Sequence, residues 1–251
     1  MIEAGSLEYA HARLGARFGE RPDELAWRRI EMIRDIGAML DATRGSPLGA
    51  WIAGLGPDAD AHAVELALRA HLRQRVMAIA AWMPPPWRAS VEWCALCMDL
   101  PVLQHLARGG RVPPWLRDDP LGAALREGDG GHADGGPRFL LAAGKRDPDR
   151  IAAIWRAEWH RRLPVPVASA PLLADLVRVL GEHATAFRQP WQVEGGSLRR
   201  ALHVRLTRLF RRALLDPAAA FIFLALSALD RERLRGEILR RVVFPRLPLA
   251  S

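Results

Sequence analysis

The sequence predicts an all-α fold built from repeated helical modules. Apolar residues recur at spacings of three and four along several long segments, as they do on one face of an amphipathic helix. No segment shows the sustained alternation of a half-buried strand. Helix starts are marked by a capping side chain followed by proline, which suits the first helical turn. These pairs are Ser46 with Pro47, Asp119 with Pro120, Asp147 with Pro148, and Asp216 with Pro217.

Composition indicates a globular, basic protein. The chain has 251 residues, of which 50% are hydrophobic and 25% charged, so it can bury a core as one large domain or two small ones. The net charge is +8 and Lys145 is the only lysine. Such a surface suits an acidic partner, whether nucleic acid, anionic lipid or protein. No secretory signal is visible at the N-terminus, so the cytoplasm is the expected compartment.

The N-terminal module is predicted to span residues 1–125. A helical segment at 28–43 precedes a long helix that starts near Val64 and ends before the proline break at 84–86. An apolar helix containing "VEWCALCMDL" follows, and a short helix is expected from Asp99. The apolar stripe of the long helix consists of Val64, Ala67, Leu68, Leu72, Val76, Ile79, Ala80 and Met83.

Cys94 and Cys97 form a CxxC pair within that apolar helix. No second cysteine or histidine pair completes four zinc ligands, and a redox pair would need a strand-to-helix turn. We therefore expect both cysteines to be buried and inert.

A glycine-rich linker is predicted at residues 126–147. Asp129, His132 and Asp134 lie in it and could be imagined as metal ligands. Because a loop so rich in glycine would lose much entropy on coordinating a metal, we interpret the segment as a linker and expect no metal site.

The C-terminal module is predicted to span residues 148–251. A helical segment at 171–187 precedes a long amphipathic helix from Ser197, with its leucines on one face and five arginines mostly on the other. The arginine face is either a solvated surface or a docking surface for an acidic partner. A 12-residue apolar run at 218–229 follows, too short for the roughly 20 residues of a membrane span, and Asp230 should start another short helix. The run is therefore expected to be the buried segment of the module.

The two modules share an order of elements: a basic amphipathic helix, a break at proline, an apolar helix and a short helix begun by aspartate. No phosphate-binding loop, nucleophile elbow or HExxH motif occurs, and the histidines are scattered. Trp155 and Trp159 share a helix face and are expected in the core. We predict no catalytic, cofactor-binding or metal-ligating residue.

The N-terminal third resembles the C-subunit family of V-type ATPases and ATP synthases, whose member in the eukaryotic pump is called the d subunit. In "EYAHARLGARF" the residues Tyr9, Ala12, Arg13 and Arg17 match the opening of that family. Further matches are Leu40, Thr43, Glu65, Ala67 and Leu68, and the closing "DPAAAFIFLALSALDRERLRGEIL" resembles the last module of the family. Family members carry three modules, whereas this chain has about two, so the resemblance implies a truncated funnel.

The resemblance implies a non-catalytic adaptor of the central stalk of a V-type rotary ATPase or ATP synthase. Such an adaptor would lie peripherally on the cytoplasmic face of the membrane and couple the proteolipid c-ring to the central shaft during proton or sodium transport. It would bind neither nucleotide nor nucleic acid. Candidate contact residues are Arg13, Arg17, Arg200, Arg205, Arg208, Arg211 and Arg212. The alternatives are a basic helical nucleic-acid-binding protein, an unrelated helical scaffold, or an enzyme using the cysteines or the glycine-rich loop.

Overall fold

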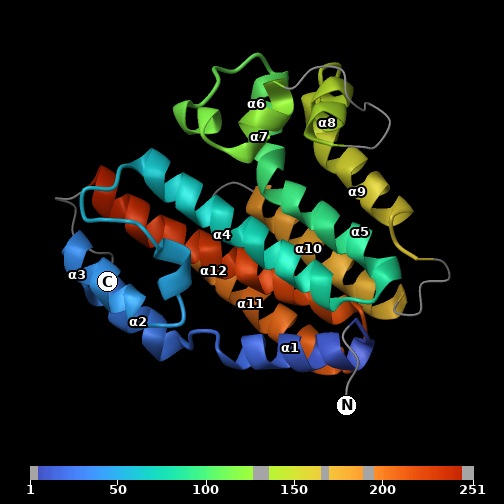
Figure 1. The fold of residues 1–251 in the computed structure, drawn as a ribbon, viewed down its shortest axis with the longest axis horizontal. Coiled ribbons are helices and arrows are strands. Elements are labelled where there is room, and N and C mark those ends of the chain that lie inside the picture. Colours follow the sequence, from blue (N-terminus) through green and yellow to red (C-terminus); the bar gives the residue numbers. More distant parts are fainter. Residues whose placement is uncertain (1–4, 127–135, 165–169, 189–194, 245–251) are drawn as a thin grey trace.

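The computed structural model describes residues 5–126, 136–164, 170–188 and 195–244, and these parts contain helices and no strand (Figure 1). The predicted all-α class is confirmed. Among the described helices, none combines the length and the hydropathy that crossing a bilayer demands.

The N-terminal helices are α1 (Leu7–Gly19), α2 (Glu24–Met32) and α3 (Ile36–Arg44), followed by a 3-10 turn at Gly49–Ile52. The predicted single helical segment at 28–43 is therefore two helices. The reason is local, because the Asp35 side chain accepts a hydrogen bond from the Ala38 amide at 2.8 Å and caps a new helix there.

Helix α4 (Ala61–Trp82) turns at the prolines into α5 (Pro85–Trp93), which runs back along it (Figure 1). The apolar helix predicted around the cysteines is wrong in part, because Cys94–Asp99 forms a 3-10 helix before α6 (Leu100–Ala107). Pro101 lacks the amide hydrogen that would continue an α-helix through this segment.

Part of the predicted linker is helical. Helix α7 (Pro120–Arg126) precedes it, whereas α8 (Pro137–Gly144) lies inside it and packs against α6 and α9 (Ile151–Arg161). Leu140 is fully buried, so the segment after Pro137 contributes to the core. The high glycine content before Pro137 explains why the predicted linker extends over this helix. Asp129, His132 and Asp134 lie outside the described residues.

The C-terminal helices are α10 (Ala170–Arg188), α11 (Gly195–Arg212) and α12 (Ala218–Val243). Helix α12 continues through Asp230, so the predicted break there is wrong. The side chain of Asp230 is engaged by Arg21 at the end of α1 instead of capping a new helix. The apolar run at the start of α12 is buried, as predicted.

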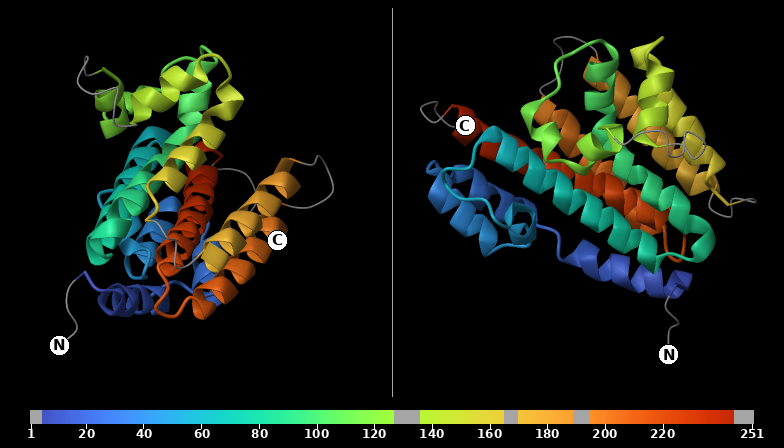
Figure 2. Two further views of the ribbon diagram at one scale, coloured as in Figure 1. Left: turned by 90° about the vertical axis from the view of Figure 1, so that its right-hand side faces the viewer. Right: turned by 45° about the horizontal axis from the view of Figure 1, so that its top comes forward.

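Helices α4 and α12 run antiparallel through the middle of the molecule, with α1, α2 and α3 along one side and α10 with α11 on another (Figures 1 and 2). One apolar cluster includes Val76 of α4 and Ile222 of α12, so it draws on residues before and after the glycine-rich segment. A second cluster joins α2 and α3 to the first half of α4 and to Leu234 and Ile238 of α12.

The predicted stripes and caps are largely confirmed. Leu68 and Ile79 of α4 and Leu206 of α11 are fully buried. Trp159 is buried. The indole N–H of Trp93 donates to the backbone carbonyl of Trp155, and the indole N–H of Trp155 donates to the backbone carbonyl of Trp93. The four capping side chains each accept a hydrogen bond from a backbone amide two residues further on; these are Ser46, Asp119, Asp147 and Asp216.

Candidate functional site

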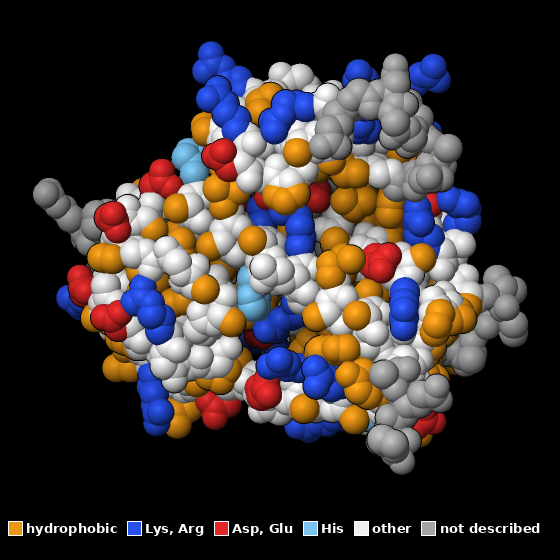
Figure 3. All heavy atoms as spheres, viewed as in Figure 1, with side chains coloured by type: hydrophobic (Ala, Val, Ile, Leu, Met, Phe, Trp, Pro, Cys, Tyr) orange, Lys and Arg blue, Asp and Glu red, His pale blue; other side chains and the backbone are white. Residues whose placement is uncertain are grey.

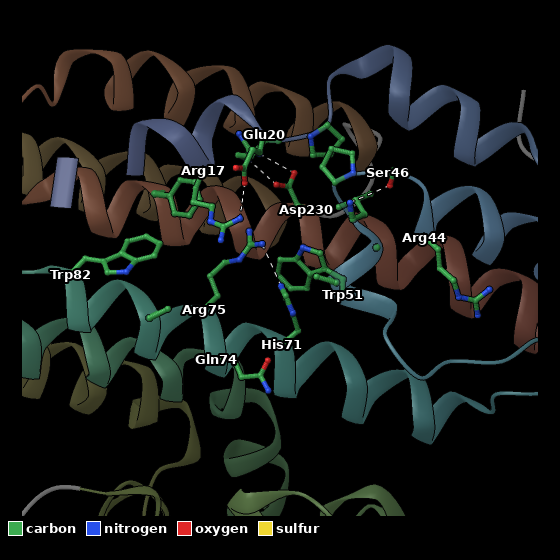
Figure 4. Close-up of a pocket in the computed structure, with 18 residues that line it drawn as sticks. Arg17, Glu20, Arg44, Ser46, Trp51, His71, Gln74, Arg75, Trp82 and Asp230 are labelled. Atoms are coloured by element: carbon green, nitrogen blue, oxygen red, sulfur yellow. Dashed lines mark hydrogen bonds and ion pairs between the residues drawn. The ribbon is translucent and has the colours of Figure 1, made fainter. Parts of the chain in front are cut away.

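A cleft of about 610 Å³ opens between α1 and α4. The segment from Ser46 to Trp51 lines it, as do Phe223 and Asp230 of α12. In the space-filling view it is a hollow near the centre of the face, edged by arginine and histidine side chains (Figure 3). Figure 4 shows the side chains that project into it. A cleft of this size is typical of small-ligand sites.

Arg21 and Asp230 fix the geometry of the cleft. The guanidinium of Arg21 donates from Nε at 2.8 Å and from Nη2 at 2.9 Å to the two carboxylate oxygens of Asp230. Their side chains are 7% and 6% exposed. A bidentate pair in such a desolvated position is strong and directional. It therefore ties the end of α1 to α12 and holds the two sides of the cleft at a defined distance.

Arg75 is the cation for which the cleft provides least compensation. Its guanidinium lies 4.7 Å from the Trp51 ring centroid and donates to Ser227 Oγ at 3.4 Å and to His71 Nε2 at 3.3 Å. Within the described parts of the chain, no carboxylate comes within ion-pairing distance of it. The pKa of Arg75 is lowered, mainly by burial. The positive charges of Arg17 and Arg21 lower this pKa further, whereas the negative charge of Asp230 raises it.

His71 is neutral at pH 7 in this cleft. Burial, then the charges of Arg75 and Arg17, lower its pKa to about 4. Because Arg75 can only donate, the Nε2 atom of neutral His71 must accept this hydrogen bond, and the proton resides on Nδ1. The Trp51 and His71 ring centroids are 4.4 Å apart, which fixes the imidazole in position.

Two predicted contact residues lie on α1, and one of them lines the cleft. The guanidinium of Arg17 pairs with Glu20 at 2.7 Å, and both side chains are more than half exposed. Arg13 lies over the Trp82 ring at 5.0 Å and over Tyr9 at 5.9 Å. Tyr9 and Arg13 of the resemblance are therefore in contact, while Arg17 projects into the cleft.

The predicted arginines of α11 lie on a different surface and are partly neutralised. Arg205 pairs with Glu182, and Arg212 lies 3.8 Å from Asp175, both acids being on α10. Three others are exposed and form no ion pair in the described ranges, although the charge of Arg200 helps to lower the pKa of Glu24; these are Arg200, Arg208 and Arg211. The structure does not bring the seven predicted residues together at one site.

A buried ion network, which the sequence did not reveal, connects α4 to α12. Glu65 accepts from Arg69 Nε at 2.8 Å, from Arg231 Nη2 at 2.9 Å and from Arg235 Nε at 2.7 Å. Burial opposes the ionisation of Glu65, but these arginines outweigh it and lower its pKa. The network is structural, since its charges pair with one another and none of its residues lines the cleft.

A second set of pairs adjoins the first on the same face of α4, since Glu65, Arg69 and Arg73 follow one another at intervals of four. Arg69 also donates to Asp99, and Arg73 donates to Asp119 at 2.6 and 2.8 Å and to Asp99 at 3.2 Å. The Asp119 side chain is 1% exposed. These contacts hold α4 against the segments that begin with Asp99 and Pro120.

The expectation of two buried cysteines is only partly met. Cys94 is half-buried and donates weakly to the Ser90 carbonyl at 3.5 Å, whereas Cys97 is exposed. The hydrogen bond to Cys94 raises the pKa of Cys97 well above its usual value, so the nucleophilic thiolate is disfavoured. Among the residues that the structure describes, no three His, Cys, Asp or Glu side chains form a group able to hold a metal ion.

Sequence reasoning missed His71 and Arg75, two of the α4 residues that line the cleft. Their spacing of four places them on one face of the helix, beside the apolar stripe. A signal was therefore present, but an arginine next to an apolar stripe is common and did not separate this site from a solvated helix face. Comparison with known protein families, with curated proteins and with solved structures finds no match. The chemistry of the cleft consequently follows from its own geometry.

Proposed function

We propose that this chain is a non-catalytic adaptor of the central stalk of a V-type rotary ATPase or ATP synthase. In this role it would couple a proteolipid ring to the shaft on the cytoplasmic face of a membrane. The proposal begins from the sequence resemblance and gains physical support from the way the helices are tied together.

The observation that carries the proposal is a pair of long helices held together by ion pairs. Helix α4 has 22 residues and α12 has 26, lengths of roughly 33 and 39 Å at 1.5 Å per residue. Glu65 binds α4 to α12, and Asp230 binds α12 to α1 through Arg21. A part that transmits torque must resist bending and sliding of its helices, and buried directional pairs resist sliding.

The residues of the resemblance occupy positions that suit this role. Glu65 is the acceptor at the centre of the network between α4 and α12. Leu40 and Thr43 are both buried, and Leu40 belongs to the apolar cluster that includes the first half of α4. Arg13 and Arg17 are exposed on α1. The match therefore combines residues that hold the body together with residues that are exposed at the surface of α1.

The docking surface that we assign to the adaptor is the exposed arginine face of α11. The exposed residues Arg200, Arg208 and Arg211 belong to it, and none of them forms an ion pair within the described chain. Exposed charges of this kind steer association and select partners of opposite charge.

Affinity purification from detergent-solubilised membranes of the source cells tests the proposal. The tagged chain should retain the proteolipid ring and shaft subunits, identified by mass spectrometry. Changing Arg200, Arg208 and Arg211 together to Gln should reduce this retention. The matched control changes three exposed arginines on other surfaces, Arg29, Arg34 and Arg111, and should retain the complex. Recovery of an assembled rotary ATPase without the tagged chain would reject the adaptor role.

The same arginine face favours a second candidate, binding to nucleic acid. Arginines that neutralise phosphates release counterions, so the affinity would fall steeply as salt increases. Electrophoretic mobility shifts with duplex DNA and single-stranded RNA at several salt concentrations distinguish the candidates. Tight, salt-dependent binding that the three α11 substitutions abolish would favour nucleic acid over the ring.

A further inference from the structure

The cleft between α1 and α4 carries an excess of positive charge that the fold itself leaves uncompensated. Among the described residues, four arginines and two carboxylates line it. Arg44 pairs with Asp41, which is not among the lining residues, and one of the two lining carboxylates, Asp230, is engaged by Arg21. The other, Glu20, is at the exposed edge with Arg17. The interior of the cleft is therefore cationic.

Two guanidinium groups are directed into the same part of the cleft. Arg17 approaches from α1 and Arg75 from α4, and their heads lie near each other with His71 beside them (Figure 4). Two cations that face one another in a partly desolvated space repel. An anion placed between them would turn this repulsion into two attractive contacts.

Arg75 is held in place but is incompletely satisfied. The Trp51 ring supports its guanidinium, and its two hydrogen bonds, at 3.3 and 3.4 Å, are both longer than the usual 2.7–3.2 Å for a nitrogen donor. A guanidinium has five N–H donors, so several remain to be used here. Trp51 is 1% exposed, and its rigid packing keeps the head of Arg75 oriented before any ligand arrives.

We propose that this cleft binds a small molecule carrying a carboxylate or phosphate group, with the oxyanion between Arg17 and Arg75. Planar guanidinium donors match the oxygens of carboxylate and phosphate groups, often two at a time. The Nε2 atom of His71 is an acceptor and keeps its contact with Arg75, so it does not bind the oxyanion itself, whereas Gln74, which is exposed and lines the cleft, adds amide donors. This site is separate from the α11 arginine face, so it extends the proposed function without depending on it.

Isothermal titration calorimetry with the full chain at low salt tests the site, with inorganic pyrophosphate and citrate as probes. At least one probe should bind with a dissociation constant of about 1 mM or lower. Arg75→Met keeps the apolar stem and removes the donors, so it should weaken binding about tenfold or more. Arg29→Gln removes the same charge from an exposed position on α2 and should leave the affinity unchanged. Loss of affinity to the same extent in both variants would overturn the proposal, because only net charge would then matter.

A second measurement reports on the position of the anion. In NMR titrations of the imidazole protons, a bound anion should raise the pKa of His71 in the wild type, since it offsets the nearby arginine charges. Arg75→Met should show no such response while its circular dichroism spectrum stays helical. Absence of binding by both probes would reject the site, and so would binding only to a polyglutamate peptide or to duplex DNA, which would indicate a macromolecular surface.

Discussion

Helix α4 carries arginines in two contrasting environments. Arg69 and Arg73 lie among Glu65, Asp99 and Asp119, and each donates to two of these carboxylates. Arg75, further along the helix, has an aromatic ring, a hydroxyl and a neutral imidazole as its neighbours. All three are arginines on the same helix, but among the described residues Arg69 and Arg73 have carboxylates within hydrogen-bond distance and Arg75 does not.

This difference separates a structural role from a binding role. A buried arginine that is matched by carboxylates contributes to the fold, and removing its partner leaves a charge that water cannot reach. A half-buried arginine without a carboxylate is poorly compensated within the fold. Such residues persist most often where they serve a ligand, because sites of function commonly sacrifice some stability.

The largest effect is expected for Glu65→Gln. The amide removes the negative charge that Arg69, Arg231 and Arg235 share, so the free energy of unfolding should fall by about 3–5 kcal/mol. Urea unfolding followed by circular dichroism measures it. Glu92→Gln, at an exposed position on α5, is the matched control and should change stability by less than about 0.5 kcal/mol. A loss below about 1 kcal/mol at Glu65 would show that the network behaves like a surface pair.

A direct comparison of Arg69→Met with Arg75→Met should give the next largest effect. The first change leaves Glu65 and Asp99 short of a buried partner, and about 3 kcal/mol of stability should be lost. The second removes an uncompensated cation, so the ligand-free protein should remain within about 0.5 kcal/mol of wild type or become more stable. Parallel urea titrations give both values. Equal losses would erase the distinction between the two environments.

The sequence predicted the helices well because helix formation is largely local. The stripes that contain Leu68 and Leu206 follow from periodicity, and the cap at Asp216 follows from a side chain beside its own helix. The same local reasoning failed at Asp230. That aspartate looks like a cap, but its partner is Arg21, which is distant in the sequence.

The cleft could not be predicted for a related reason. Its two principal cations, Arg17 and Arg75, belong to different helices, and no local pattern states that these helices pack together. The sequence did single out Arg17, through the family resemblance, but assigned it to a partner surface and not to a cleft. Whether an arginine is compensated depends on the folded arrangement of carboxylates, and residue order alone does not contain that information.

A smaller effect is expected from pH at His71. Its pKa in the folded protein, about 4, is below the usual 6.5, so the unfolded chain takes up the proton first. Stability should therefore fall as pH decreases from 6.5 towards 4, and His71→Asn should remove on the order of 1 kcal/mol of this fall after allowance for solvent screening. Urea midpoints at several pH values measure it. His183 and His203 have lowered pKa values as well, so part of the dependence should remain. An unchanged dependence in the variant would show that folding does not lower the pKa of His71.

The smallest effect on stability is expected for Arg17→Gln. Its pair with Glu20 has side chains 53% and 57% exposed, and pairs of this kind contribute between zero and about 1 kcal/mol, here less than about 0.5. The same change should weaken pyrophosphate binding several-fold, because Arg17 faces Arg75 across the cleft. Urea unfolding and calorimetry on one protein preparation measure both quantities. A variant that loses stability but keeps its affinity would place Arg17 with Arg69, among the arginines that hold the fold together.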